Sequence, residues 1–200
     1  MPDEIREILE ASKTILHGHF LLTSGLHSPT YLEKFRLLQF PHYTERLCRP
    51  IAEHFRQMGI EVVAGPTLGG IILAYEVARQ LGARCIFAER VGQKREFRRG
   101  LSIAQGEKVL IVDDILTTGG SALEVLEAVK ESGGSVLGVG VLVDRSGAEV
   151  DLRTPLFSCH TLAIPTYSPD ECPQCAAGEP LARPGGLDLP GIEGQTQPRP

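Results

Sequence analysis

The sequence predicts an α/β fold, a mostly parallel sheet flanked by helices. After residue 60, short apolar stretches that read as strands alternate with stretches that read as helices. A chain of 200 residues with 42% hydrophobic content can bury one sizeable core. Together these observations predict a sheet covered on both faces, in one domain with appendages.

The N-terminal region precedes this alternation. Apolar residues at helical spacing predict one helix over residues 3–16 and a second over residues 43–58, which Gly59 closes. The stretch between them, GHFLLTSGLHSPTYLEKFRLL, holds too many Ser, Gly, Pro and Thr for one helix. Short strands and turns are expected there.

The remaining elements follow in a regular order. Strands are predicted at residues 61–65, 84–89, 108–114 and 135–144, and helices at residues 70–81 and 121–132. Gly82 ends the first of these helices, and the pair Gly133 and Gly134 ends the second. From Ala177 onward ten of 24 residues are Pro or Gly, which predicts an extended or disordered tail. The expected organisation is an N-terminal helix and hood (1–40), a core (41–176) and the tail (177–200).

Composition limits the possible partners. A net charge of −5 argues against a nucleic-acid or anionic-membrane surface over the whole protein. The charged start MPDEIREILE has no apolar region typical of a signal peptide, and no apolar run approaches membrane-spanning length. Five cysteines, an odd number, do not suggest a disulfide framework. The expectation is a reduced cytoplasmic enzyme without nucleic-acid or membrane partners.

The stretch KVLIVDDILTTGGSALE, residues 108–124, carries the most informative pattern. Its strand leads to Asp113 and Asp114 near the carboxyl end, where open α/β sheets place ligands. Residues 117–121 then lead into a helix, so backbone N–H groups, hydroxyls and the positive helix end can surround a phosphate monoester. Carboxylates beside that cradle suit sugar hydroxyls or Mg²⁺. The plainer alternative is a strand end followed by a Ser121 helix cap, and neither a P-loop nor a Rossmann glycine motif is present.

VLIVDDILTTGGSA resembles the phosphoribosyl-pyrophosphate (PRPP) motif of the type I phosphoribosyltransferase family. FLLTSGLHSPTY and VLVDRSG resemble the members of that family that use orotate, and with AGPTLGG and IFAER the resemblance spans about residues 15–146. It implies the family's fold, with a small N-terminal hood over the base site. It also implies transfer of the 5-phosphoribosyl group from PRPP to orotate in pyrimidine biosynthesis, with Mg²⁺ bound to PRPP and a homodimeric enzyme.

The resemblance also assigns residues. For PRPP they are Arg90, Lys94, Asp113, Asp114, Ile115, Leu116, Thr117, Thr118, Gly119, Gly120 and Ser121. Thr67, Leu68, Gly69 and Gly70 would form a pyrophosphate loop, and Thr117, Arg145 and Tyr31 would contact orotate. Relatives often carry Lys at the positions of Gly69 and Thr23, so two charges are missing here. Without the resemblance, Arg145 reads as a surface ion pair with Asp144 or Glu149.

A basic stretch, ERVGQKREFRRG at residues 89–100, forms a local anion attractor in an acidic chain. The alternative is a solvated basic hairpin. In the family a mobile loop here closes over PRPP, often in the neighbouring subunit's site. The resemblance makes Lys94 the candidate catalytic cation, beside Asp113 and Asp114.

The stretch CHTLAIPTYSPDECPQC offers metal ligands. Cys172 and Cys175, in Cys-x-x-Cys spacing, could bind structural zinc with Cys159 and His160. Adjacent Cys159 and His160 would face opposite ways on a strand, so a thiol-containing turn that packs the C-terminus is the alternative. Two further functional hypotheses stay open: a phosphoribosyltransferase for a purine or another base, and a PRPP-sensing regulator with the same fold.

Overall fold

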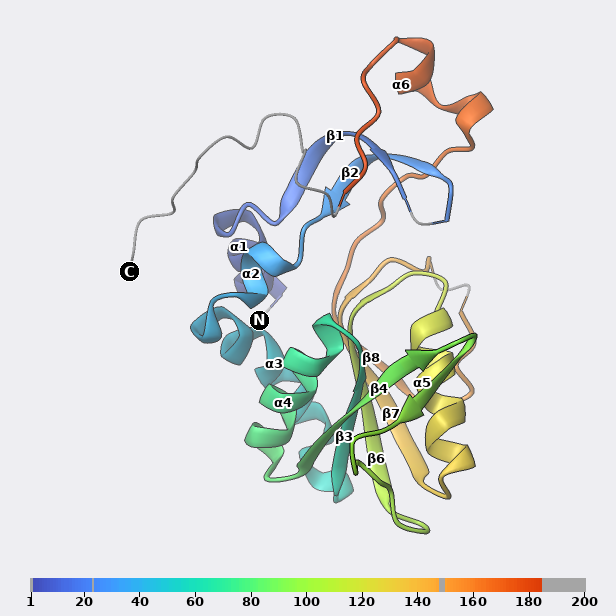
Figure 1. Ribbon diagram of the computed structural model, residues 1–200. Helices are drawn as coiled ribbons and strands as arrows, with labels where there is room; N and C mark the ends of the chain where they lie inside the picture. Colours follow the sequence, from blue (N-terminus) through green and yellow to red (C-terminus); the bar gives the residue numbers. More distant parts are fainter. Residues whose placement is uncertain (1, 23, 148–149, 185–200) are drawn as a thin grey trace. The chain divides into compact units, whose positions relative to one another are not determined.

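The computed structural model describes residues 2–22, 24–147 and 150–184 (Figure 1). The chain divides into two compact units. The core unit comprises Met1–Ser12 and Lys34–Ala163, and the hood unit comprises Lys13–Glu33 and Ile164–Pro200. These bounds differ from the expected ones, because the first helix belongs to the core unit and the segment after residue 163 belongs to the hood unit.

The core unit is built on a six-stranded sheet with the order β5-β4-β3-β6-β7-β8. Its strands are β3 (Val62–Pro66), β4 (Arg84–Val91), β5 (Lys94–Phe97), β6 (Lys108–Leu116), β7 (Ser135–Asp144) and β8 (Leu156–Thr161). Every neighbouring pair is parallel except β4 and β5, which form an antiparallel hairpin. The predicted α/β class and mostly parallel sheet are thus confirmed.

Helices cover both faces of this sheet, as Figure 1 shows. The helices of the core unit are α1 (Pro2–Ala11), α2 (Phe35–Leu38), α3 (Pro41–Phe55), α4 (Gly69–Leu81) and α5 (Gly120–Glu131). α3 and α4 pack against each other and against the sheet, and α5 packs on the other face over an apolar cluster. Among the described residues, no helix is both long and apolar enough to cross a membrane.

Two glycines of β7 let α3 approach the sheet closely. A Cβ on Gly138 would lie 2.5 Å from Cε1 of Phe55, and a Cβ on Gly140 would lie 2.6 Å from Cγ2 of Ile51. The intervening Val139 points to the opposite face, into the cluster under α5. In SVLGVGVLVD the glycines therefore lie on the face that α3 contacts closely, and Val139 lies on the face that packs into the apolar cluster under α5.

The first helix is shorter than predicted. It ends at Ala11, and the predicted helical residues Ile15 and Leu16 begin strand β1. Lys13 has a φ of 49°, in the left-handed region that interrupts a helix, and the hydroxyl of Ser12 donates to the carbonyl of Leu9. Ile15 and Leu16 fit the helical spacing by chance, because they are apolar residues of the strand that follows the helix.

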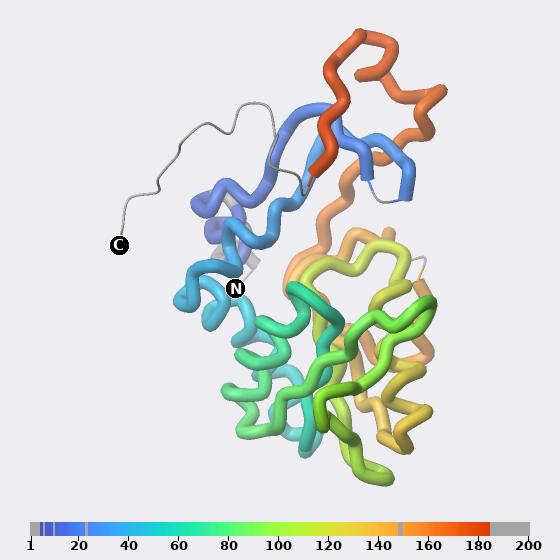
Figure 2. Tube along the Cα trace, in the orientation of Figure 1, coloured from blue at the N-terminus to red at the C-terminus, as the bar shows by residue number. Residues whose placement is uncertain are grey.

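The hood unit joins two segments that are far apart in the sequence. β1 (Ile15–Leu21) and β2 (His27–Leu32) form an antiparallel pair. The later segment carries the 3-10 turn η2 (Pro169–Glu171) and the short helix α6 (Pro173–Ala176). It pairs with the hairpin at both ends, since the His27 N–H donates to Tyr167 O and the Leu21 N–H donates to Ala182 O, both at 2.9 Å. Figure 2 shows the blue and orange-red segments side by side. Residues 185–200 of the predicted tail lie outside the described residues.

Candidate active site

The acid pair lies inside β6, and the strand continues to Leu116 before the glycine turn. Thr117 and Thr118 are exposed, and α5 begins at Gly120 without a side-chain cap. The first-turn N–H groups of such a helix have no partner within the helix and can receive an anion. Two features require glycine at position 119. Its φ of 76° lies in the left-handed region, and a Cβ there would lie 2.5 Å from Cγ1 of Val150.

Asp113 and Asp114 are 8% and 4% exposed. The backbone N–H of Asp114 donates to Oδ1 of Asp113 at 2.8 Å, and Nζ of Lys34 forms an ion pair with Oδ2 of Asp114 at 2.7 Å. Burial, and then the charge of Asp114, raise the pKa of Asp113 to about 7, although Lys34 and Arg95 oppose the rise. A carboxyl group that titrates near neutrality beside an anion cradle is a feature of functional sites.

Replacement of Lys34 by Met should move the pH dependence of the site upward. Without the ammonium group, the pKa of Asp113 rises further, because one of the charges that lower it is gone. We expect the acid limb of any activity that requires ionised Asp113 to shift by about one pH unit towards alkaline pH. Lys34→Arg keeps the charge and should keep the wild-type profile. An unshifted limb in Lys34→Met would show that this pair does not control the ionisation of the site.

The second predicted loop lies between β3 and α4 and meets the acid pair. A Cβ on Gly69 would overlap Oδ2 of Asp114 and lie 3.5 Å from Cε of Lys34. A lysine at position 69, which the family resemblance led us to consider, is therefore incompatible with this arrangement. The ammonium of Lys34 comes to the same carboxylate from the segment before α2 and supplies a positive charge there. Sequence reasoning missed Lys34, and no local motif marks it.

The loop is fixed by hydrogen bonds to the neighbouring hairpin. The backbone N–H of Thr67 donates to Ala88 O at 3.2 Å, and Nη1 of Arg95 donates to Oγ1 of Thr67 at 3.2 Å. Leu68 is exposed, and the peptide bond between Thr67 and Leu68 is cis. The predicted pyrophosphate loop, the acid pair and Arg95 therefore belong to one corner of the core unit.

The predicted basic stretch forms the β4–β5 hairpin, and four of its five cations are ion-paired. Arg90 and Arg95 pair with Glu124 in the first half of α5, Arg99 pairs with Glu89, and Lys94 pairs with Glu131. These acids offset much of the positive charge that the stretch has by itself. The segment is a basic hairpin, but Arg95 is buried, which a fully solvated hairpin would not show. The predicted role of the stretch in binding PRPP stays a prediction.

Within the hairpin, Lys94 and Arg95 have different surroundings. The Lys94 side chain is 70% exposed and pairs with the last residue of α5, at the opposite end of the helix from the glycine turn. Arg95 is 7% exposed and contacts Thr67. The catalytic role of Lys94 stays a prediction. In strand β5, Arg95 faces inward between exposed Lys94 and Glu96. This alternation would have identified Arg95 as buried, but no strand was predicted here from the sequence.

The turn after β7 lies against the end of β6. The backbone N–H of Arg145 donates to Leu116 O at 2.8 Å. Oδ1 of Asp144 accepts from the N–H and hydroxyl of Ser146, so Asp144 stabilises this turn. The alternative partner Glu149 lies outside the described residues. Leu116 packs its side chain in the core, so only its backbone is available to a ligand, whereas Ile115 is partly exposed.

The remaining predicted residues lie in the hood unit or on the sheet edge. Tyr31 is on β2, with its ring 5.8 Å from that of Phe20, and Thr23 is outside the described residues. Cys159 is on β8 of the core unit, where its thiol donates to Leu47 O at 3.6 Å. Burial raises the pKa of Cys159 to about 12, which favours the thiol over the thiolate that binds metals.

A group of potential metal ligands in the hood unit differs from the predicted zinc ligands. Cys172 and Cys175 gather with His19 and His27, and neither Cys159 nor His160 is a member of that group. Neither His19 nor His27 was among the predicted ligands. Eight positions separate the two histidines in the sequence, and only the β1–β2 hairpin brings them together.

Comparison with known proteins extends this description. A family model described as "Phosphoribosyl transferase domain" matches residues 40–168. The chain is 50% identical over 187 residues to the orotate phosphoribosyltransferase of Caldanaerobacter subterraneus subsp. tengcongensis, covering 94% of this chain and 98% of the relative. It is 44% identical over 185 residues to the orotate phosphoribosyltransferase of Thermotoga maritima, covering 92% of this chain and 99% of the relative.

Solved structures resemble the chain over most of its length. The orotate phosphoribosyltransferase of Aeropyrum pernix matches with a TM-score of 0.69 and 27% identity, covering 79% of this chain and 93% of that chain. The adenine phosphoribosyltransferase of Rhodothermus marinus matches with a TM-score of 0.62 and 20% identity, covering 78% of this chain and 99% of that chain. At that identity the second likeness concerns the fold alone.

Proposed function

The chain belongs to the phosphoribosyltransferase family, and from this premise we infer that it transfers the 5-phosphoribosyl group of PRPP to orotate in pyrimidine biosynthesis. The products are orotidine 5'-monophosphate and pyrophosphate. One observation carries the choice of orotate: relatives about 50% identical over nearly the whole chain are orotate phosphoribosyltransferases.

The corner at β6 supplies what the sugar phosphate needs. We propose that residues 117–121 receive the 5-phosphate through first-turn amides and hydroxyls. Asp113 and Asp114, when ionised, would accept hydrogen bonds from the ribose hydroxyls and stabilise the positive charge that develops on the sugar ring. Because the pKa of Asp113 is about 7, this stabilisation requires a pH near or above neutrality.

The leaving pyrophosphate would lie at the loop between β3 and α4. The amides of residues 67–70 and the guanidinium of Arg95, which bonds to Thr67, are the supporting features. The resemblance implies that Arg90 and Lys94 also bind PRPP. In the structure both side chains form ion pairs with glutamates of α5. Binding of pyrophosphate by either cation would have to compete with those carboxylates. The orotate contacts of Thr117, Arg145 and Tyr31 likewise stay proposals.

Magnesium is part of the proposal, bound with PRPP. The acid pair fits it chemically, because carboxylate oxygens are ligands that Mg²⁺ prefers. The electrostatics fit as well: the charge of Asp114 raises the pKa of Asp113, and a divalent cation nearby would relieve that repulsion. When bound, Mg²⁺ would neutralise charge on the pyrophosphate, while the protein residues orient the sugar.

The test is pyrophosphate release from PRPP and Mg²⁺, measured with orotate and in parallel with adenine and hypoxanthine. We expect turnover with orotate at least 100-fold above that with either purine. Preference for a purine would favour the first alternative function. PRPP binding by calorimetry without turnover of any base would favour the regulator.

A homodimer and a cytoplasmic location complete the proposal. None of the five cysteines, all of which lie among the described residues, forms a disulfide, which suits a reducing compartment. The dimer rests on the family resemblance, with the β4–β5 hairpin as the segment that would serve the neighbouring site. Light scattering on the eluting protein measures its mass: twice the chain's 21.7 kDa supports the dimer, and the monomer mass contradicts it.

A further inference from the structure

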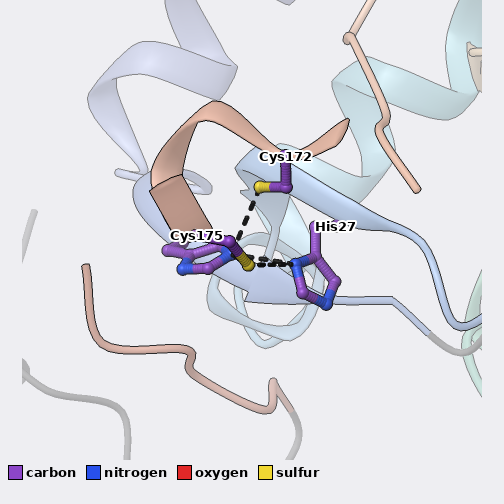
Figure 3. Close-up of side chains that lie close together, drawn as sticks. His27, Cys172 and Cys175 are labelled. Carbon is purple, nitrogen blue, oxygen red and sulfur yellow. Dashed lines mark hydrogen bonds between the residues drawn. The ribbon is translucent and has the colours of Figure 1, made fainter. Parts of the chain in front are cut away.

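Four side chains of the hood unit converge on one point. His19 and His27 come from the β1–β2 hairpin, Cys172 is the residue before α6, and Cys175 lies within α6. One potential ligand atom from each lies within 4.8 Å of all the others. Figure 3 shows Cys172, Cys175 and His27 pointing toward one another. Three of the four residues are buried, and Cys175 is exposed.

The spacing of these atoms matches the ligands of a single tetrahedral ion. Nε2 of His19 lies 3.0 Å from Nδ1 of His27, 3.4 Å from Sγ of Cys172 and 3.6 Å from Sγ of Cys175. Sγ of Cys175 lies 3.2 Å from Nδ1 of His27. With Zn–N near 2.0 Å and Zn–S near 2.3 Å, tetrahedral geometry requires ligand–ligand distances of about 3.3 to 3.8 Å. These four distances agree within a few tenths of an ångström, and the other two pairs of ligand atoms lie within 4.8 Å.

Hydrogen bonds alone do not account for the arrangement. Nδ1 of His19 lies 2.9 Å from the carbonyl oxygen of Glu179, which can only accept, so Nδ1 carries the proton and Nε2 carries a lone pair. Three polar atoms surround that one lone pair. It can accept one good hydrogen bond, whereas a metal ion between the four groups would use it together with the other ligands. The carbonyl bond also orients the ring as ligating histidines require.

The two segments of the hood unit are joined by backbone hydrogen bonds but share only a small apolar core. Its buried apolar residues among those described are Phe20, Leu32, Cys172 and Ala182. An equal number of its buried residues are polar: Thr14, His19, His27 and Ser28. Units with so small an apolar core usually need disulfides or a metal, and the cysteines here are free.

We propose that His19, His27, Cys172 and Cys175 bind one structural zinc ion that joins the β1–β2 hairpin to the segment around α6. Two thiolates and two neutral imidazoles make the Zn²⁺ site electrically neutral, which suits its burial. Two sulfur and two nitrogen donors in tetrahedral array favour zinc over magnesium or calcium. Four protein ligands leave no open position, so the ion stabilises structure and takes no part in the transferase reaction. Side-chain bonds from Gln174 to Gly18 O and to Glu179 support the ligand turn.

The first test is the metal content of the untagged full-length chain, grown with zinc, reduced and dialysed against metal-free buffer. We expect about one zinc per chain by plasma mass spectrometry. Titration of the metal-free reduced chain with Co²⁺ should give the intense visible bands of tetrahedral cobalt and a thiolate charge-transfer band. Zinc below about a tenth per chain without these cobalt bands would overturn the proposal. Stoichiometric iron, or a Cys172–Cys175 disulfide in the freshly purified chain, would overturn it as well.

Variants identify the ligands. Cys172→Ser, Cys175→Ser and His19→Asn should each lower zinc occupancy at least tenfold and remove or alter the cobalt bands. Cys159→Ser is the matched control, a cysteine of the core unit outside the cluster, and should retain one zinc. Loss of zinc from Cys159→Ser, or full retention in Cys172→Ser, would contradict this ligand set. If a ligand variant does not fold, the metal content and cobalt spectrum of the wild-type chain still decide the proposal.

Discussion

Replacement of Asp113 by Asn should make the folded chain more stable above pH 7 while removing most of its activity. Burial and the neighbouring charge of Asp114 raise the pKa of Asp113 to about 7. The side chain is therefore costly to keep ionised in the folded state. Asn keeps an oxygen that can accept from the Asp114 N–H and carries no charge. Removing an ionised group that would contact the transition state should lower kcat/KM for PRPP by about 100-fold or more.

The direction of the pH effect follows from linkage. In the folded state Asp113 binds its proton more tightly than in the unfolded state, so its contribution to stability is full below the unfolded pKa. That contribution is lost as pH rises through about 7. Asn does not titrate, so the advantage of Asp113→Asn should grow as pH rises from the unfolded pKa of about 4, be complete above pH 7 and reach roughly 1 to 3 kcal/mol. Thermal unfolding at pH 5 and pH 8, with exposed Asp170→Asn as control, measures it. Lower stability of Asp113→Asn at pH 8 would contradict the account.

Replacement of Arg95 by Met should both destabilise the core unit and impair PRPP use. The guanidinium is buried and bonds to Glu124, Thr67 and the carbonyl of Ala88. Met fills similar space but leaves these acceptors without that donor, at a cost of about 2 kcal/mol in the free energy of unfolding. Since the pyrophosphate loop loses its anchor, we expect kcat/KM for PRPP to fall at least tenfold and KM for orotate to change little.

Lys94→Ala is the matched comparison. Its ion pair with Glu131 joins two exposed side chains, so its removal should change stability by less than about 1 kcal/mol. If Lys94 is the catalytic cation, kcat falls without loss of stability. If Arg95 carries the pyrophosphate charge instead, Lys94→Ala stays near wild-type activity. Urea unfolding and steady-state kinetics on both variants separate these outcomes, and wild-type behaviour of Arg95→Met would remove Arg95 from the site.

Local sequence patterns predicted those helices and strands whose bounds are set by their own residues. The strand over residues 135–144 has the predicted bounds, because an unbroken apolar run follows a glycine pair. The helix after β3 also agrees within one residue, since Gly82 ends it in a left-handed conformation. The glycine turn was recognisable because the residues that form it are consecutive.

Features that depend on distant partners were not predictable in this way. β5, with the sequence KREF, is a strand because it pairs with β4 and its cations meet acids of α5. The Lys34–Asp114 pair joins residues 80 positions apart. The Cys-x-x-Cys spacing pointed to a metal, but its histidine partners lie about 150 positions away, and the nearby Cys159 was chosen for its proximity in sequence alone.

The hood unit is built from two segments that are far apart in the sequence, and this has a consequence during protein synthesis. Its first segment ends at Glu33 and its second begins at Ile164, so all strands of the core sheet are translated between them. The β1–β2 hairpin leaves the ribosome early. Its hydrogen bonds to Tyr167 and Ala182 can form only after the last part of the chain has emerged. The core sheet can therefore be complete in the nascent chain before the two segments of the hood unit pair, and a message truncated after codon 163 would still encode every core strand.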